Sequence, residues 1–285
     1  MSILLSLLAA ASYGLGDFNG GIFSRRGGAW AVSLVAQLSG TALVLVLVAF
    51  DGGSPTAADF AWAVLAGVGN GFGTAFLYRG LSSGRMGVVA PVSGVGAVLV
   101  PVVVGVLTGE RPGALVWVGV LLALPAIWLV SREPLAEPLI EPLPGPTESP
   151  GSGIVDGVLA GLGFGALFAS LAQVPAEAGF LPLALNQLIA GGAIIVVALT
   201  LRQDWVPRNR YALGGAISGA LGALATGLFL VATHHGYLTV AAVITSLYPA
   251  FTVLLAATVL REHVHRTQAV GLALCAGAVV LVAAG

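Results

Sequence analysis

The chain contains no lysine, a single cysteine and few charged residues of any kind. Only 8% of its 285 residues are charged, whereas an ordinary soluble domain carries about a quarter. The single cysteine, Cys275, excludes a disulfide framework or a cysteine-ligated zinc site within one chain. Without lysine the glycine-rich segments cannot supply the usual phosphate-binding loop. We therefore expect no nucleotide or other cofactor, and no nucleic-acid partner.

Apolar residues are abundant instead. They make up 58% of the chain, and the mean hydropathy is +1.01, so most of the chain must lie in lipid. The apolar residues form ten continuous runs of membrane-spanning length, at 2–23, 29–50, 58–80, 86–107, 113–131, 153–174, 181–202, 211–233, 238–260 and 266–284. The first run lacks a basic leader and a cleavage site, which indicates a retained helix. The sequence predicts an all-α integral membrane protein with ten transmembrane helices.

A proline-rich segment divides these runs into two sets of five. The tripeptide Glu-Pro-Leu recurs every four residues between Glu133 and Leu143. Proline at that density prevents a helix, so we expect an extended tether, with a partner-docking motif as the less favoured reading. The predicted organisation is a five-helix repeat at 1–130, a linker at 131–152 and a second five-helix repeat at 153–285.

The two sets resemble each other at a constant offset of 152 residues. Thr74 aligns with Thr226, and Glu110 aligns with Glu262, within a longer match of weak identity. Because each set has an odd number of helices, the second must enter the membrane in the opposite sense from the first. Such inverted repeats are suited to alternating access, in which two similar bundles open a central site to either side. A duplicated bundle kept only for stability is the alternative.

Several short motifs carry a family resemblance. Tyr13-Gly14 in the first run is echoed by Phe164-Gly165 in the sixth, Gly109-Glu110-Arg111 closes the fourth, and Tyr248-Pro249 precedes Glu262 in the ninth. Together they resemble the EamA-like branch of the drug/metabolite transporter superfamily, over essentially the whole chain. Departures from the family pattern are Ala97, where Pro249 would map, Gln37, where an arginine is usual, and His263 after Glu262. The resemblance implies a transporter, often an exporter, with its site between the halves.

Polar side chains within the runs mark the expected site, because they are costly in hydrocarbon unless they face an interior cavity. Asn70, Thr74 and Tyr78 recur at four-residue spacing and share one helix face; Thr245 and Tyr248 belong to a similar stripe in the ninth run. Ordinary hydrogen bonding between helices is the alternative for each residue. The residues that we expect to bind substrate are Tyr13, Asp17, Gln37, Asn70, Thr74, Tyr78, Gln173, Thr226, Thr245 and Tyr248.

Asp17 is the acidic residue placed deepest in a run. A carboxylate there would bind a cationic group or carry a proton, a placement similar to that of the first-helix glutamate in the small multidrug resistance branch of the same superfamily. The alternative, held equally, is that Asp17 reaches the interface and pairs with Arg25 or Arg26. His263 and His265 beside Glu262 are read as solvated residues, so we expect no metal site.

These observations favour a multi-pass secondary transporter in the inner or plasma membrane. We expect it to move a small organic solute (an amino acid, a related metabolite or a drug), favouring export, with a proton or ion as a possible coupling partner. Import of a sugar or similar solute stays open, as does, less favoured, a non-transporting subunit or an intramembrane enzyme. No His-Glu-x-x-His or Gly-x-Ser-x-Gly motif supports an enzyme.

Arginines predict an orientation. Ten of the 11 lie in the connections that follow odd-numbered runs, and the exception is Arg111. Positively charged loops favour the cytoplasm, so this distribution places both termini outside. Members of the resembling family are usually expected to have cytoplasmic ends, which conflicts with the charge count; we follow the charge count.

Overall fold

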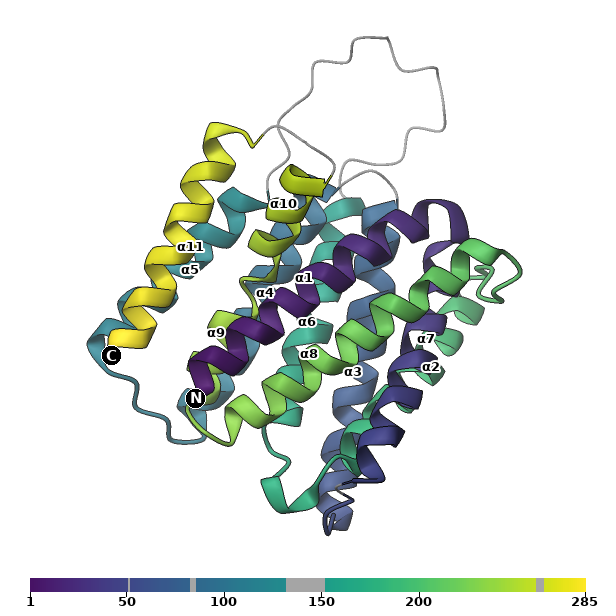
Figure 1. The fold of residues 1–285 in the computed structure, drawn as a ribbon, viewed down its shortest axis with the longest axis horizontal. Coiled ribbons are helices and arrows are strands. Elements are labelled where there is room, and N and C mark those ends of the chain that lie inside the picture. Colours follow the sequence, from purple (N-terminus) through teal and green to yellow (C-terminus); the bar gives the residue numbers. More distant parts are fainter. Residues whose placement is uncertain (51, 83–85, 132–151, 260–263) are drawn as a thin grey trace.

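The structure, a computed structural model, describes residues 1–50, 52–82, 86–131, 152–259 and 264–285. Within these ranges the chain is helical and contains no strand, which confirms the all-α class (Figure 1). Seven helices of the described chain are long and apolar enough to cross a membrane, and two shorter apolar helices accompany them. The N- and C-termini lie at the same end of the bundle (Figure 1).

The helices follow the apolar runs closely. Those of the first half are α1 (Ser2–Gly27), α2 (Ala29–Val48), α3 (Ala57–Ser82), α4 (Met86–Leu107) and α5 (Ala114–Val130). Those of the second half are α6 (Ser152–Leu171), α7 (Leu181–Thr200), α8 (Gly215–Thr233), α9 (Leu238–Thr245), α10 (Tyr248–Val259) and α11 (Arg266–Ala284). Two short 3₁₀ helices precede α7 and α8, namely η1 (Ala176–Ala178) and η2 (Arg210–Gly214). The predicted linker lies almost wholly outside the described residues, as does Glu262.

The ninth run departs from its prediction as one helix, because it is broken into α9 and α10. Pro249 explains the break. Its ring nitrogen cannot donate to the carbonyl of Thr245, and the ring would clash with that carbonyl in a continuous helix. The expected stripe that includes Thr245 and Tyr248 therefore does not lie on one helix face.

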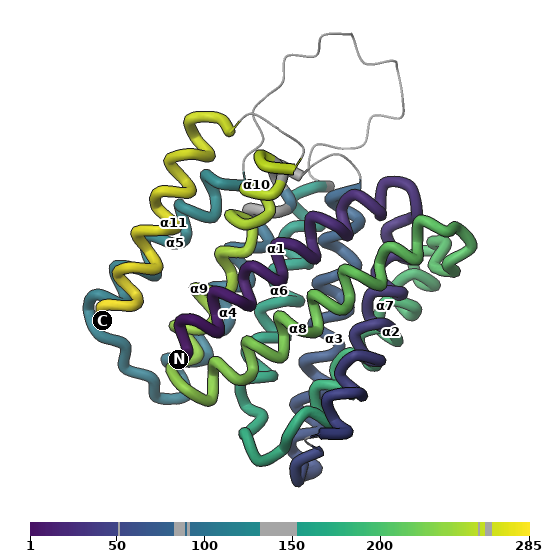
Figure 2. Tube along the Cα trace, in the orientation of Figure 1, coloured from purple at the N-terminus to yellow at the C-terminus, as the bar shows by residue number. Residues whose placement is uncertain are grey.

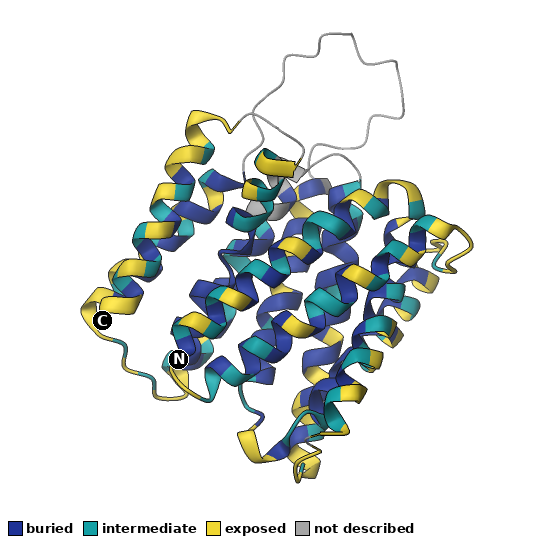
Figure 3. Cartoon of the chain, viewed as in Figure 1, coloured by how far each residue is buried: buried dark blue, intermediate teal, exposed yellow. Residues whose placement is uncertain are grey.

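Helices from the two halves interleave throughout the bundle. The first-half helix α3 packs between α6 and α7, α1 lies along α8, and α2 contacts both α7 and α8 (Figure 2). The pair formed by α5 and α11 lies at one side of the molecule, with fewer contacts to the rest. Buried residues gather along the inner helix faces, and exposed ones face outward (Figure 3). Many of the exposed ones are large and apolar, such as Leu121 and Val280, both 65% exposed, as expected for a surface covered by lipid.

Glycine allows α3 and α6 to approach closely. A Cβ at Gly69 would lie 2.6 Å from the carbonyl oxygen of Gly163, and a Cβ at Gly163 would lie 2.5 Å from the backbone nitrogen of Gly73. Both distances are shorter than any real contact, so only glycine fits at this crossing. Small residues at helix crossings are typical of membrane bundles, where packing rather than hydrophobicity drives association.

The motif glycines occupy related places in the two halves. A Cβ at Gly14 of α1 would lie 2.8 Å from the carbonyl oxygen of Tyr248, and a Cβ at Gly165 of α6 would lie 3.0 Å from the carbonyl oxygen of Gly96. Gly96 and Tyr248 are 152 residues apart, the offset of the sequence repeat. The two halves thus make equivalent helix contacts, which fits a two-repeat pattern.

Two polar contacts join the halves at opposite ends of the bundle. At one end Arg79 of α3 forms an ion pair with Asp156 of α6, with Nε donating to Oδ1 at 3.0 Å. At the other end, beyond α4, the carboxylate of Glu110 accepts backbone N–H groups of Leu238 and Thr239 in α9. The 22 residues of α4 separate the two contacts by about 33 Å along its axis.

Candidate functional site

A cavity of about 40 Å³ lies between the two halves. Its walls come from α1, α2 and α3 of the first half and from α6, α7, α8 and α10 of the second. The lining residues are Tyr13, Gly16, Asp17, Ala36, Gln37, Asn70, Thr74, Tyr78, Phe164, Phe168, Gln187, Ser218, Gly219, Gly222, Thr226 and Tyr248. This volume holds a few water molecules but is far smaller than a typical site for a drug-sized ligand. In this conformation the site is therefore too small for a drug-sized solute.

An amide and hydroxyl network forms one wall of the cavity. Gln37 of α2 donates from Nε2 to Thr74 Oγ1 at 3.1 Å and to Asn70 Oδ1 at 3.4 Å. Asn70 of α3 donates from Nδ2 to Gln187 Oε1 of α7 at 2.7 Å. Gln187 Oε1 also accepts from the Asn186 amide at 3.2 Å. These bonds tie α2, α3 and α7 together, so the alternative of hydrogen bonding between helices holds for these side chains even though four of them also line the cavity.

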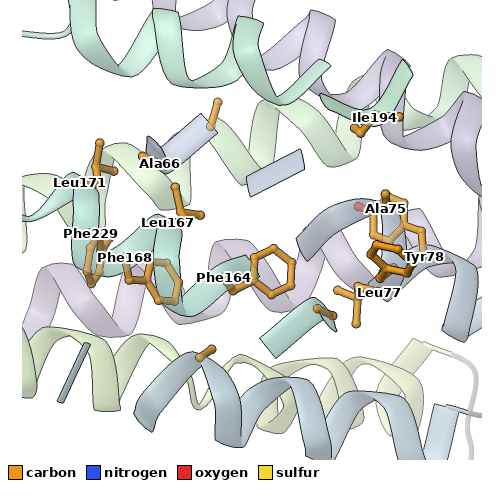
Figure 4. Close-up of a cluster of buried hydrophobic side chains, with 14 of the residues drawn as sticks. Ala66, Ala75, Leu77, Tyr78, Phe164, Leu167, Phe168, Leu171, Ile194 and Phe229 are labelled. Atoms are coloured by element: carbon orange, nitrogen blue, oxygen red, sulfur yellow. The ribbon is translucent and has the colours of Figure 1, made fainter. Parts of the chain in front are cut away.

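Aromatic residues form another part of the wall. Because the Thr226 hydroxyl donates to the carbonyl of Gly222 at 2.7 Å, Tyr13 is the donor in its 2.7 Å bond to Thr226 Oγ1. The Tyr13 ring lies edge-on to Phe168, with centroids 5.9 Å apart, and 6.2 Å from the ring of Tyr248. Phe168 packs in turn on Phe229 at 4.5 Å, within the buried cluster that also contains Phe164 (Figure 4).

Tyr78 enters the cavity across α1. A Cβ at Gly20 would lie 2.3 Å from its ring, so the absence of a side chain at Gly20 makes room for the phenol. Tyr78 itself is only 4% exposed and sits among the buried residues of α3 (Figure 4). Its neighbours along α3, Asn70 and Thr74, line the same cavity, so the stripe expected on this helix lies on one face toward the interior.

Asp17 lies on the cavity wall one turn after Tyr13. Within the described part of the chain its carboxylate has neither a hydrogen bond nor an ion pair. Arg26, one of its two expected partners, lies over the ring of Tyr211, 5.6 Å from the centroid. None of the lining residues is an arginine or a histidine, so Asp17 is the one formally charged residue on the wall.

The structure brings together eight of the ten residues that the sequence marks as substrate-binding; Gln173 and Thr245 lie elsewhere. Gln173 lies beyond the end of α6, where its amide donates to the carbonyl of Ala169 at 3.2 Å. Thr245 is fully buried at the end of α9. Both residues are predicted to bind substrate because they lie in an apolar run. That position does not show which face of a helix lines the cavity.

Four polar or aromatic lining residues fall outside the predicted set, namely Gln187, Ser218, Phe164 and Phe168. Gln187 is an amide in a run and carries the same signal as Gln37. Phe164 carries a signal through its motif, since Phe164-Gly165 echoes Tyr13-Gly14. Phe168 and Ser218 carry none, because such residues are ordinary in an apolar helix. Among the described residues, no group of three His, Cys, Asp or Glu side chains could hold a metal ion. Glu262 and His263, which the sequence places near His265, lie outside those residues.

Comparisons with known proteins place this arrangement in a family. One solved crystal structure superposes on 99% of this chain and 98% of its own with a TM-score of 0.69, at 16% sequence identity, which shows a shared fold. Comparison with curated proteins finds no match. The family model described as the EamA-like transporter family matches residues 1–132 and 151–284, once in each half. The two matches cover nearly the whole sequence, and the chain therefore belongs to the EamA-like transporter family, a family of membrane transporters of small solutes.

Proposed function

We propose that this protein is a secondary transporter that moves a small organic solute, favouring export, by alternating access around the central cavity. Counting α9 and α10 as one broken span gives five spans in each half, and the linker at 131–152 then joins two repeats of opposite orientation. The first repeat is 1–130 and the second is 153–285. An amino acid, a related metabolite or a drug is the range of solutes that the family resemblance implies.

The observation that carries this proposal is the composition of the cavity wall. Its polar groups come from both halves, and hydrogen bonds cross between the halves beside it, among them those from Tyr13 to Thr226, from Asn70 to Gln187, and between Ser93 and Tyr248. A solute bound there would contact both repeats at once. Any relative movement of the repeats would then change its access to the two sides of the membrane.

The small volume implies that the site changes shape during transport. A cavity of about 40 Å³ must widen to accept an organic solute. The Arg79 contact at one end and the Glu110 contact at the other both join the halves in this conformation. Opening toward either side would require one of these contacts to separate while the other holds.

A gradient would supply the energy. The sequence offers no phosphate-binding lysine for ATP, so movement would follow the gradient of the solute or of a coupling ion. The ninth span is broken beside Tyr248, which lines the cavity, and transporters use such discontinuous helices to bind ions and polar groups. Import of a sugar or similar solute uses the same geometry, so direction is settled only by experiment.

The rival is a membrane subunit without transport activity, or an intramembrane enzyme. An enzyme needs a nucleophile beside a base, or a metal, at its site. The cavity wall offers one carboxylate and several amides and hydroxyls, with no histidine or cysteine among the lining residues. This set is better suited to binding than to covalent chemistry.

Solute counterflow in liposomes containing only this protein tests the proposal. Vesicles preloaded with each of a panel of amines, amino acids, sugars and drugs should accumulate the matching labelled solute for at least one class. Gly222→Phe should abolish that uptake, because the new ring would fill the cavity from a position with no atom within 4 Å. Gly192→Phe is the matched control, since Gly192 is also unobstructed but lies on the exposed side of α7.

Two results would contradict the proposal. Counterflow that is the same in Gly222→Phe as in the wild type would show that the cavity is not the route. Chemical conversion of a panel member in place of counterflow would favour the enzyme.

A further inference from the structure

The charge balance of the cavity is unusual for a buried site. Asp17 is acidic, and no basic residue lines the same wall. The nearest arginine along α1, Arg25, is eight residues away, or about 12 Å along the axis. Arg79 is engaged with Asp156. A carboxylate enclosed in a bundle is costly unless a cation or a proton neutralises it, so the cavity is built to receive positive charge.

Three of the five tyrosines in the chain line the same small cavity as this carboxylate. The hydroxyl groups of Tyr13 and Tyr248 are held by Thr226 and Ser93, at 2.7 and 3.2 Å. These bonds fix the two rings at a centroid distance of 6.2 Å and an interplanar angle of 58°. Aromatic faces attract cations, and cages of such rings are the usual way in which proteins recognise methylated ammonium groups.

The same wall is poorly equipped for an anion. A carboxylate or phosphate group would need an arginine, a lysine or several free N–H donors. No arginine lines the cavity, and the chain has no lysine. The amide donors of Gln37 and Asn70 are already committed to Thr74 and Gln187. A solute with a negatively charged group would find neutral donors on this wall, such as the Gln187 amide, but no cationic partner.

We infer that the transported solute is a small organic cation, an alkylamine or a methylated ammonium compound, whose nitrogen is bound by Asp17 and enclosed by Tyr13, Tyr78 and Tyr248. The inference rests on the proposed transport function and adds the chemical class of the solute. It narrows the range given above, because it excludes solutes whose recognition depends on a free carboxylate.

The test compares cations with uncharged molecules of the same shape. Choline with dimethylbutanol, and butylamine with butanol, are two such pairs. Each is titrated calorimetrically into the purified full-length protein in detergent, without a membrane gradient. At least one cation should bind about tenfold or more tightly than its neutral partner, the expected value of a charged hydrogen bond in a desolvated site. Equal affinity for each cation and its neutral partner, or no binding by either cation, would overturn the inference. This measurement needs only the wild-type protein.

Substitutions then locate the cation. Asp17→Asn should weaken binding of the favoured cation about tenfold or more, and Asp17→Glu should retain most of it, because the charge is kept. Asp204→Asn, at an exposed aspartate in the loop before η2, is the matched control and should bind normally. Cation binding that is unchanged in a correctly folded Asp17→Asn protein would place the cation elsewhere and refute the assignment.

The outcomes separate this inference from the proposed function. Neutral solutes could show counterflow whose pH dependence disappears in Asp17→Asn, while neither cation binds. Asp17 would then carry a proton, so the transport proposal would stand and the cation assignment would fall. If a cation binds at Asp17 but no solute shows counterflow, the binding site stands and the transporter proposal falls.

Discussion

Glu110 holds Thr239 across the boundary between the halves: its Oε2 accepts the backbone N–H of Thr239 at 3.0 Å, while Oε1 accepts that of Leu238. The first N–H groups of a helix have no partner within the helix, and their aligned dipoles favour a negative charge. A carboxylate from the end of α4 therefore caps α9. Because α9 has only eight residues, this cap satisfies a large share of its unpaired donors.

Replacement of Glu110 by alanine should lower stability by about 1–2 kcal/mol, the usual cost of losing a helix cap with a charge. The measurement is the unfolding temperature of the purified protein in detergent. Glu177→Ala is the matched control, because Glu177 is exposed in η1. Identical unfolding temperatures for the two variants would show that the cap does not stabilise the assembled halves.

The Arg79 and Asp156 pair should behave as a coupled unit. Arg79→Met leaves Asp156, only 5% exposed, as an unpaired buried carboxylate. We therefore expect the free energy of unfolding to fall by about 1–3 kcal/mol. The loss should be smaller than for a fully buried pair, because Arg79 is partly exposed. Arg79→Met combined with Asp156→Leu should recover part of that loss. A double variant whose loss equals the sum of the single losses would show that the two side chains are energetically independent.

Gly20→Ala should impair both folding and transport. The new methyl group would lie 2.3 Å from the ring of Tyr78, and forcing the ring aside should cost about 1–3 kcal/mol. Displacing Tyr78 should also weaken solute uptake in counterflow. Gly192→Ala, with no atom within 4 Å of the new group, should leave uptake unchanged and gain up to about 1 kcal/mol in helix propensity. Normal uptake by Gly20→Ala would show that the position of Tyr78 does not matter.

Shortening the 131–152 segment by one Glu-Pro-Leu unit should leave transport intact. A proline-rich polar tether contributes little packing, and removing a few residues changes its reach only slightly. The measurement is counterflow per molecule, with membrane abundance determined separately. If transport were lost at normal abundance, the segment would have a role in the folded bundle.

Single cysteines should reveal the orientation in the membrane. The arginine distribution predicts that an impermeant thiol reagent added outside intact cells labels Ser54→Cys but not Val206→Cys. Val206 is 42% exposed and precedes η2, where Asn209 bonds to the carbonyl of Arg26, so it reports on the arginine-rich side. Ser24, on the same side, is only 3% exposed and would be unsuitable. Labelling of position 206 alone would reverse the proposed orientation.

The helices were predictable from sequence to different degrees. Runs such as 86–107 and 266–284 match α4 and α11 within a residue, because hydropathy reports directly on burial in lipid. The first run was predicted to end at residue 23, but α1 continues to Gly27. Arg25 and Arg26 lower the hydropathy there without ending the helix. Hydropathy locates the membrane boundary, and the helix can extend past it into water.

The site was predictable where its signal was local. Asn70, Thr74 and Tyr78 could be grouped because four-residue spacing fixes a common helix face whatever the helix packs against. Ser218 gave no such signal. Its place on the cavity wall depends on how α8 crosses α1, which is decided by contacts between helices far apart in sequence. The same limit placed Gln173 in the predicted site although it lies beyond the end of α6.

The glycine crossing of α3 and α6 bears on how the protein can be divided. These helices come from different repeats, yet their backbones touch so closely that no side chain fits at the crossing. Each repeat also leaves its inner faces to be covered by the other, since α1 lies along α8 and α2 contacts α7 and α8. The sequence repeat and the packed unit are thus different divisions of one chain. A copy made alone would lack the surfaces that complete it.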